Sequence, residues 1–164
     1  MKADVVPLRQ QHFAGLRGAL DAIAREGRYL AFLQAPPEEE AFAFYRSIME
    51  RVCTHFVGVF EGQVVGWCDV LPAHGEARAH VGILGVGLLP AFRGCGNGAA
   101  LMGAAIERAW DKGLTRIELT VRTDNLRAKR LYERLGFTVE GTHRQAFRVG
   151  SQSFDSISMA LLRA

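Results

Sequence analysis

The sequence predicts a mixed α/β fold with one β-α-β unit at its centre. Stretches in which apolar and polar residues alternate predict strands, and apolar residues spaced three and four positions apart predict helices. Both patterns recur along the 164 residues. In the middle of the chain, an apolar strand pattern leads through a glycine-rich turn into a helical pattern, and a second strand pattern follows. A β-α-β unit requires this order of elements.

The first third of the chain predicts one short strand and two helices. The strand covers residues 4–8, and an amphipathic helix over residues 11–26 ends at Gly27. Residues 28–35 are more aromatic and apolar than a connecting loop requires, which suggests a lid or a pocket wall. Two prolines then begin a second helix that continues through Val52, and three glutamates in its first turn complement the helix dipole.

A hairpin and the strand that enters the glycine-rich turn come next. Strands over residues 55–60 and 63–71 flank a short turn that contains Gly62. After a polar break, an apolar strand covers residues 81–89. The helix that leaves the glycine-rich turn has an apolar face along one side, so it is expected to lie on a sheet, and it ends at Gly113.

The last third of the chain predicts a strand, a helix and a hairpin. Residues 116–121 alternate between apolar and polar side chains and therefore predict a strand. A helix over residues 126–135 stops at Gly136. The remaining residues to 162 predict a final hairpin that turns near Gly150.

Length and composition are those of one globular domain over residues 1–164. Apolar residues make up 49% of the chain and charged residues 23%, which is ordinary for a folded protein in water. The formal net charge of +3 is mild, and the basic residues are spread along the chain. This distribution argues against a nucleic-acid surface and is compatible with a local site for an anionic small ligand.

The cysteines and the hydropathy pattern point to a cytoplasmic protein. Cys53, Cys68 and Cys95 are an odd number without CxxC spacing, so neither a disulfide framework nor a zinc site is expected, and no metal is predicted. No apolar run approaches the roughly 18 residues that would span a bilayer. We therefore expect a cytoplasmic location with no membrane partner.

The turn after the strand over residues 81–89 has the composition of a phosphate site. Gly94, Gly96 and Gly98 lie immediately before a helical pattern, with Arg93 at the start of the turn. Glycine lets the backbone approach a ligand closely. The first turn of a helix has N–H groups without partners and carries the positive end of the helix dipole. Together these features predict a ligand that bears phosphate or pyrophosphate.

Two familiar glycine motifs fit this turn less well than a third. A P-loop requires a lysine after the glycines, and none is present. A dinucleotide fingerprint matches Gly94, Gly96 and Ala99, with Glu118 about twenty residues later. However, residues 90–93 separate the strand from this motif, and too few strands follow it to complete a doubly wound sheet.

The third motif is [QR]xxGx[GA], which residues 93–98 match as RGCGNG. The strand RIELTV, then Asn125, then LYERLGF with Tyr132 follow at a characteristic spacing. With these residues the chain resembles the GCN5-related N-acetyltransferase (GNAT) family. The resemblance covers about residues 56–162 and, less closely, the helices before them.

The resemblance implies both a fold and a co-substrate. The expected fold is a twisted, mostly antiparallel sheet of about six to seven strands, with the β-α-β unit at its centre and helices on both faces. The co-substrate is acetyl-CoA, whose pyrophosphate binds backbone N–H groups of the turn and whose pantetheine arm pairs with residues 85–89. By resemblance, the residues expected to bind the coenzyme are Leu88, Leu89, Arg93, Gly94, Cys95, Gly96, Asn97, Gly98, Asn125 and Arg130.

The implied reaction is direct attack of an amine on the thioester, which requires a neutral amine. A lysine-like amine costs roughly 4.6 kcal/mol to deprotonate at pH 7, whereas an α-amine costs only about 1.4 kcal/mol. Glu118 and His80 are the candidate bases, although each also fits an ordinary surface role. Many family members place a glutamate where this chain has residues 81–84, so the base is either moved or replaced by water.

Two further roles follow from the resemblance. A backbone N–H near Leu88 or Leu89 is expected to stabilise the oxyanion. Tyr132 matches the family's general acid for the departing thiolate, a proton transfer that is uphill by roughly 2 kcal/mol at reference pKa values. Tyr132 also lies on an apolar helix stripe, so a core aromatic is the alternative interpretation.

The sequence leaves the acceptor and part of the function open. The expected acceptor is a primary amine of a small molecule or a protein N-terminus. The alternative function is a catalytically silent acyl-CoA-binding regulatory domain, which would be consistent with the missing glutamate. The resemblance admits a homodimer, for which the sequence contains no decisive surface patch.

Overall fold

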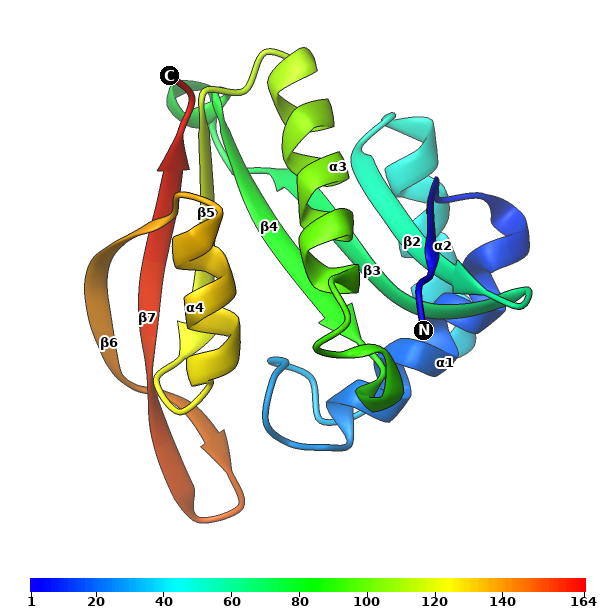
Figure 1. Cartoon of the computed structure of the whole chain (residues 1–164), viewed down its shortest axis with the longest axis horizontal. Coiled ribbons are helices and arrows are strands. Elements are labelled where there is room, and N and C mark those ends of the chain that lie inside the picture. The colour runs from blue at the N-terminus through cyan, green and yellow to red at the C-terminus, as the bar shows by residue number, and fades with distance from the viewer.

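The structure is a computed structural model that describes residues 1–164 and contains one seven-stranded sheet (Figure 1). The strands lie in the order β1-β2-β3-β4-β5-β7-β6, and all neighbouring strands are antiparallel except β4 and β5. The strands are β1 (Asp4–Pro7), β2 (Thr54–Phe60), β3 (Gln63–Pro72), β4 (Val81–Leu88), β5 (Arg116–Arg122), β6 (Thr138–Val149) and β7 (Gln152–Leu162). The prediction of a mixed α/β fold with a mostly antiparallel sheet is therefore confirmed.

Four helices connect these strands, and each lies where the sequence predicts one. The helices are α1 (Phe13–Ala24), α2 (Glu38–Glu50), α3 (Asn97–Asp111) and α4 (Leu126–Arg134). Three short 3-10 turns, which the sequence patterns did not indicate, are η1 (Gln10–His12), η2 (Glu76–Arg78) and η3 (Pro90–Phe92). The last of these begins with a proline, whose fixed φ angle suits the first position of a helical turn. None of the helices is long and apolar enough to cross a membrane.

The helices cover both faces of the sheet, as predicted (Figure 1). Successive strand residues point to opposite faces, and the two hydrophobic cores follow this alternation. On β3, Cys68 packs in the core beneath α3 and α4, whereas its neighbour Trp67 packs in the core beneath α1 and α2. The two cores together hold the sheet between two helical layers.

Strands β4 and β5 pair over only three residues and then separate (Figure 1). The last parallel pair joins Ile83 to Glu118. Beyond it, β4 continues to Leu88 against β3 alone, and β5 continues to Arg122 against β7 alone. The sheet is therefore open in the middle, at the end where α3 and α4 begin.

We expect Leu101→Ala to lower the free energy of unfolding by about 2–5 kcal/mol, because this leucine is fully buried in α3 against the sheet. The matched change Leu126→Ala should cost about 0.5 kcal/mol or less, because 56% of Leu126 is already exposed at the start of α4. Urea unfolding followed by circular dichroism measures both values. Equal losses in the two variants would contradict the assignment of the core.

Candidate functional site

A cavity of about 530 Å³ occupies the gap between the separated halves of β4 and β5. Its wall includes residues 84–88 of β4 and residues 119–121 of β5. On the α3 and α4 side, the other lining residues are Arg93, Gly94, Gly96, Gly98, Ala99, Asn125, Arg127, Ala128, Leu131, Tyr132 and Arg134. On the α1 side, Ile23 and residues 29–31 complete the wall, together with Phe147 of β6. The cavity thus passes through the sheet from one face to the other.

The edge of β4 offers unpaired backbone groups to this cavity. Leu89 donates its N–H to the Val65 carbonyl at 2.9 Å. Hydrogen-bonded and non-hydrogen-bonded pairs alternate along an antiparallel ladder, so Val86 directs its N–H and C=O groups, and Leu88 its N–H, away from β3 and toward the gap. The Leu88 carbonyl accepts a hydrogen bond from Arg93. Of the two candidate oxyanion donors, Leu88 therefore has its N–H toward the cavity, whereas the N–H of Leu89 is already used.

The glycine-rich turn has the backbone conformation that a phosphate site needs. Gly94 and Gly96 have φ angles of 74° and 86°, which side chains rarely allow, and Gly96 is the N-cap of α3. The first N–H groups of α3 have no partners inside the helix. Gly98 lies against Leu131, because a Cβ atom at this position would stand 3.2 Å from the Leu131 side chain. Its small size lets α3 begin close to α4.

The side chains of Asn97 and Cys95 do not line the cavity. Asn97 is buried, donating to the carbonyls of Phe92 and Met1 at 3.0 and 2.9 Å and accepting the Ala3 N–H at 3.0 Å. The half-buried Cys95 contacts the Arg93 carbonyl. Only the backbone of these two residues is in a position to contribute to the turn.

The guanidinium of Arg93 is engaged within the protein. It donates to the Leu88 carbonyl at 2.9 Å and to both carboxylate oxygens of Glu26 at 3.0 and 2.6 Å. It also stacks on the ring of Tyr29, 4.6 Å from the ring centroid. The sequence suggests a cation at the mouth of the turn, but the structure uses this cation to hold the segment that follows α1.

Arg127 on α4 lies over the turn instead. A Cβ atom at Gly94 would overlap the Arg127 guanidinium, so this side chain crosses directly above the glycine. Arg127 lines the cavity and forms no ion pair within the chain. Arg130, which the sequence suggests as a coenzyme contact, is exposed and does not line the cavity.

The segment of residues 25–36, between α1 and α2, closes the cavity on the α1 side. Arg122, at the end of β5, donates to the Gly27 carbonyl at 2.9 Å and stacks 3.6 Å from the ring centroid of Phe154. The far end of the segment returns to α1, where Asp21 accepts the Ala35 N–H at 2.8 Å. The sequence suggests a lid or a pocket wall here, and Tyr29, Leu30 and Ala31 do form wall.

Tyr132 lines the cavity near the base of the gap. It is 7% exposed and packs against Phe137, with ring centroids 6.1 Å apart. Its hydroxyl forms no hydrogen bond within the chain. Burial, with a smaller contribution from Cys68, raises the pKa of Tyr132 well above its ordinary value. The residue is therefore both a core aromatic and a hydrogen-bond donor facing the cavity, and it is suited to donate a hydrogen bond rather than to lose its proton.

Asn125 also lines the cavity while it caps α4. Its side-chain oxygen accepts the Ala128 N–H at 3.3 Å, which satisfies one of the free donors at the start of the helix. The neighbouring Asp124 is held by Arg122 through contacts of 3.0 and 2.6 Å. The cap and the cavity contact of Asn125 therefore coexist.

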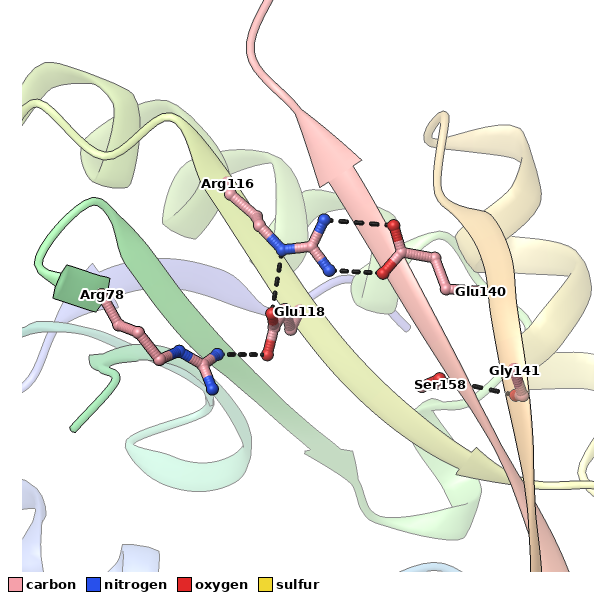
Figure 2. Close-up of polar contacts among 6 residues, drawn as sticks. All are labelled: Arg78, Arg116, Glu118, Glu140, Gly141 and Ser158. Atoms are coloured by element: carbon pink, nitrogen blue, oxygen red, sulfur yellow. Dashed lines mark hydrogen bonds and ion pairs between the residues drawn. The ribbon is translucent and has the colours of Figure 1, made fainter. Parts of the chain in front are cut away.

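Glu118 is engaged in an ion-pair network outside the cavity (Figure 2). It accepts hydrogen bonds from Arg78 and Arg116, each at 2.8 Å, and Arg116 also pairs with Glu140. Burial alone would raise the pKa of Glu118, but the two arginines lower it below its ordinary value. Such a carboxylate is a weaker base than a free one.

His80 lies just before β4, exposed and outside the cavity. Its carbonyl accepts the N–H groups of Thr115 and Arg116 at 3.0 and 3.2 Å. The structure therefore brings neither candidate base, Glu118 or His80, to the cavity wall. No three His, Cys, Asp or Glu side chains come together in a way that could hold a metal ion.

Two wall residues have no signal in the sequence. Ile23 and Phe147 line the cavity, yet each belongs to an ordinary apolar pattern of its helix or strand. They meet only because α1 and the β6–β7 hairpin fold toward the same gap.

Comparison with known proteins identifies the family. The model of the acetyltransferase (GNAT) family matches residues 19–137. An uncharacterized N-acetyltransferase of Mycobacterium tuberculosis is 36% identical over 121 residues, which cover 74% of this chain and 73% of that protein. An L-amino acid N-acetyltransferase of Escherichia coli is 31% identical over 109 residues, 65% of this chain and 67% of that protein.

A further relative is longer than this chain. The mycothiol acetyltransferase of an Arthrobacter species is 42% identical over 79 residues, which cover 47% of this chain and 24% of that protein. The match thus spans about a quarter of that relative. Among solved structures, a phosphinothricin acetyltransferase of Sinorhizobium meliloti in complex with AcCoA has a TM-score of 0.91 at 18% identity, over 99% of this chain and 89% of that one.

We expect Gly96→Ala to destabilise the protein by about 1–2 kcal/mol, because its φ of 86° is strained for a residue with a side chain. Gly103→Ala should instead be neutral or stabilising by up to about 1 kcal/mol, because Gly103 is inside α3 with open space around it. Thermal unfolding of both variants tests whether the two changes in stability differ in this way. A Gly96→Ala protein as stable as the wild type would contradict the strained turn.

Proposed function

The chain belongs to the acetyltransferase (GNAT) family, and on this premise we propose that it transfers the acetyl group of acetyl-CoA to a primary amine. One observation carries the proposal. The gap between β4 and β5 leads from the turn at Gly94 and Gly96, past an unpaired strand edge, to the hydroxyl of Tyr132. An elongated ligand with an anionic group at one end and a reactive group at the other matches this course.

The anionic end of acetyl-CoA is the group that the glycine-rich turn suits. The free N–H groups at the start of α3 and the positive end of its dipole favour a diphosphate. Arg127 supplies the side-chain cation, because Arg93 is already paired with Glu26. The amides of the pantetheine arm match the N–H and C=O groups that Val86 directs toward the gap.

The thioester end then falls between two donors that the chain supplies. The N–H of Leu88 is proposed to stabilise the oxyanion that forms when the amine attacks the carbonyl. The hydroxyl of Tyr132 is proposed to donate a hydrogen bond to the departing sulfur. Full transfer of its proton would be uphill by more than the roughly 2 kcal/mol of the reference values, because burial raises the pKa of Tyr132.

The shape of the cavity favours a small acceptor. The 25–36 segment closes the side of the sheet opposite the glycine-rich turn, with Tyr29 and Leu30 in the wall and Phe147 beside them. An amino acid or another compact amine is compatible with this space, and two relatives are described as amino acid and mycothiol acetyltransferases. An amine at a protein N-terminus is the alternative acceptor. A cytoplasmic location and a homodimer stay predictions of the sequence.

We expect Tyr132→Phe to lower kcat by about tenfold or more while the affinity for acetyl-CoA stays within about twofold of the wild-type value. The lost hydrogen bond acts on the departing thiolate, and a donor to a charged group contributes about 1.5–3 kcal/mol. A panel of primary amines, with free thiol release as the readout, finds the acceptor and measures kcat. Calorimetry measures coenzyme binding.

The same panel separates the two functions that the sequence left open. If acetyl-CoA binds the wild-type protein and no amine releases thiol, the chain is a binding domain and the proposal fails. The absence of a carboxylate side chain on β4 and the pairing of Glu118 with two arginines are the observations that keep this alternative in the test.

We expect Arg127→Gln to weaken acetyl-CoA binding about tenfold, because the variant loses the free cation above Gly94. Arg130→Gln is the matched control on the same helix. Its exposed side chain does not line the cavity, so its dissociation constant should stay near the wild-type value. Calorimetric titration of both variants at two salt concentrations tests this. A larger loss in the Arg130 variant would reverse the assignment.

A further inference from the structure

A largely buried acid lies behind the cavity and has no role in the function proposed so far. Asp69 on β3 faces the α1 and α2 layer, and its carboxylate oxygen Oδ2 is 3.5 Å from Nε2 of His55 on β2. The His55 side chain is 3% exposed and its Nδ1 has no hydrogen-bond partner. The Asp69 side chain is 15% exposed, so protons and water can reach it. Buried acids without a strong cationic partner are costly and call for an explanation.

Asp69 does not itself line the cavity, but its carboxylate packs against a glycine of β4 that does. Gly85 pairs with Asp69 across the two strands and lines the cavity. A Cβ atom on Gly85 would stand 3.1 Å from Oδ1 of Asp69, so the acid occupies the space that a side chain on β4 would fill. The next residue on the same face, Gly87, is covered in the same way by the ring of Trp67. Side chains of β3 therefore lean over β4 toward the gap.

The position of Asp69 matches the side from which an acceptor must come. The coenzyme reaches the gap from the glycine-rich turn on the α3 and α4 side. The acceptor must then meet the thioester from the other side, where the wall includes Tyr29, Leu30 and the backbone of Gly85. Asp69 stands on that side of the sheet.

We propose that Asp69 is the general base that removes a proton from the acceptor amine, directly or through one water molecule, at the position where Gly85 of β4 has no side chain. The proposal rests on the acetyltransferase function proposed above. It places on β3 the carboxylate that the sequence of β4 lacks. Glu118 and His80, the bases suggested by the sequence, do not line the cavity either, and Glu118 is paired with two arginines.

The electrostatics of the pair support this role. Burial raises the pKa of Asp69 to about 7, against the opposing effect of the nearby Gly85 amide. Burial also lowers the pKa of His55 to about 4, so the imidazole is neutral at pH 7 and offers no cation to stabilise the carboxylate. The other titratable groups within reach of its charge are Tyr45 on α2 and Cys68 on β3, and both have raised pKa values. The charge of Arg17 on α1 opposes the rise in the pKa of Tyr45 and does not shift the pKa of Asp69.

The protons balance in this scheme. The ammonium form of the acceptor has three protons on nitrogen, and the amide product keeps one. Asp69 accepts the first proton and releases it to solvent. The neutral amine then forms the C–N bond, the C–S bond breaks, and the electron pair leaves on sulfur. The second proton passes from nitrogen to that sulfur, which the Tyr132 hydroxyl stabilises, and the products are the amide and the free thiol.

The test replaces the acid with its neutral isostere. Asp69→Asn should lower kcat/KM by about 100-fold or more for an α-blocked lysine amide, whose amine is mostly protonated at pH 7. The loss should be smaller for an amino-acid amide, whose amine has a pKa near 8. Because Asp69 must be ionised to accept a proton, the wild-type kcat/KM should rise through about pH 7, and the variant should lack this inflection. Asp111→Asn, at the far end of α3, is the matched control and should behave as wild type.

A second measurement does not depend on turnover. In the intact wild-type chain, the carboxyl carbon of Asp69 should titrate by NMR with a midpoint near 7, and a midpoint near 4 would overturn the proposal. Full activity of Asp69→Asn with an unchanged pH profile would overturn it and leave the acetyltransferase function standing. A wild-type protein that binds acetyl-CoA and acetylates neither of the two amides nor any amine of the panel would overturn both. If the variant fails to fold, the NMR midpoint decides.

Discussion

The end of pairing between β4 and β5 after Ile83 and Glu118 is the constraint on which the rest of the structure depends. A sheet that stays paired has no room for a ligand between its strands, and a sheet that opens leaves backbone N–H and C=O groups without partners. The chain opens the sheet only where helices begin on one face and the 25–36 segment crosses the other. The unpaired N–H and C=O groups of Val86 and the unpaired N–H of Leu88 therefore face a cavity, where an elongated ligand with amides of its own can pair with them.

Charged side chains hold this opening in shape. Arg93 follows β4 and Arg122 ends β5, and each binds the same short segment, through Glu26 and the Gly27 carbonyl. The separated ends of β4 and β5 are therefore both bound to the 25–36 segment. At the paired end, Arg78 of η2, Glu118 and Arg116 of β5, and Glu140 of β6 form a chain of ion pairs that passes over β7 (Figure 2). Arg93 and Glu118, which the sequence suggests as functional residues, thus stabilise the fold around the cavity. Arg127 forms no ion pair and is available to bind an anion.

Glycines on β4 leave space that side chains of the neighbouring strand β3 occupy. Gly85 and Gly87 leave space on the α1 and α2 face, and Asp69 and Trp67 of β3 fill it. Because Gly85 and Gly87 have no side chains, the backbone of β4 stays accessible to a ligand. A functional group needed beside the ligand can then come from the next strand. The carboxylate of Asp69 stands where a residue at position 85 would otherwise point.

The local patterns of the sequence determined the helices, the strands and the glycine-rich turn at Gly94 and Gly96, because periodicity, turn residues and caps act over a few neighbouring residues. The family resemblance, and not a local pattern, pointed to Tyr132 and Asn125 as site residues. The lone acid in the apolar strand around Asp69 was a signal that could have been used, since such acids are rarely buried without purpose. Only the tertiary structure decided that Arg93 and Glu118 are paired within the protein, that Arg127 rather than Arg130 covers the turn, and that Asp69 stands behind Gly85. Each of these depends on which residues from distant parts of the chain meet, and strand order and register set those meetings.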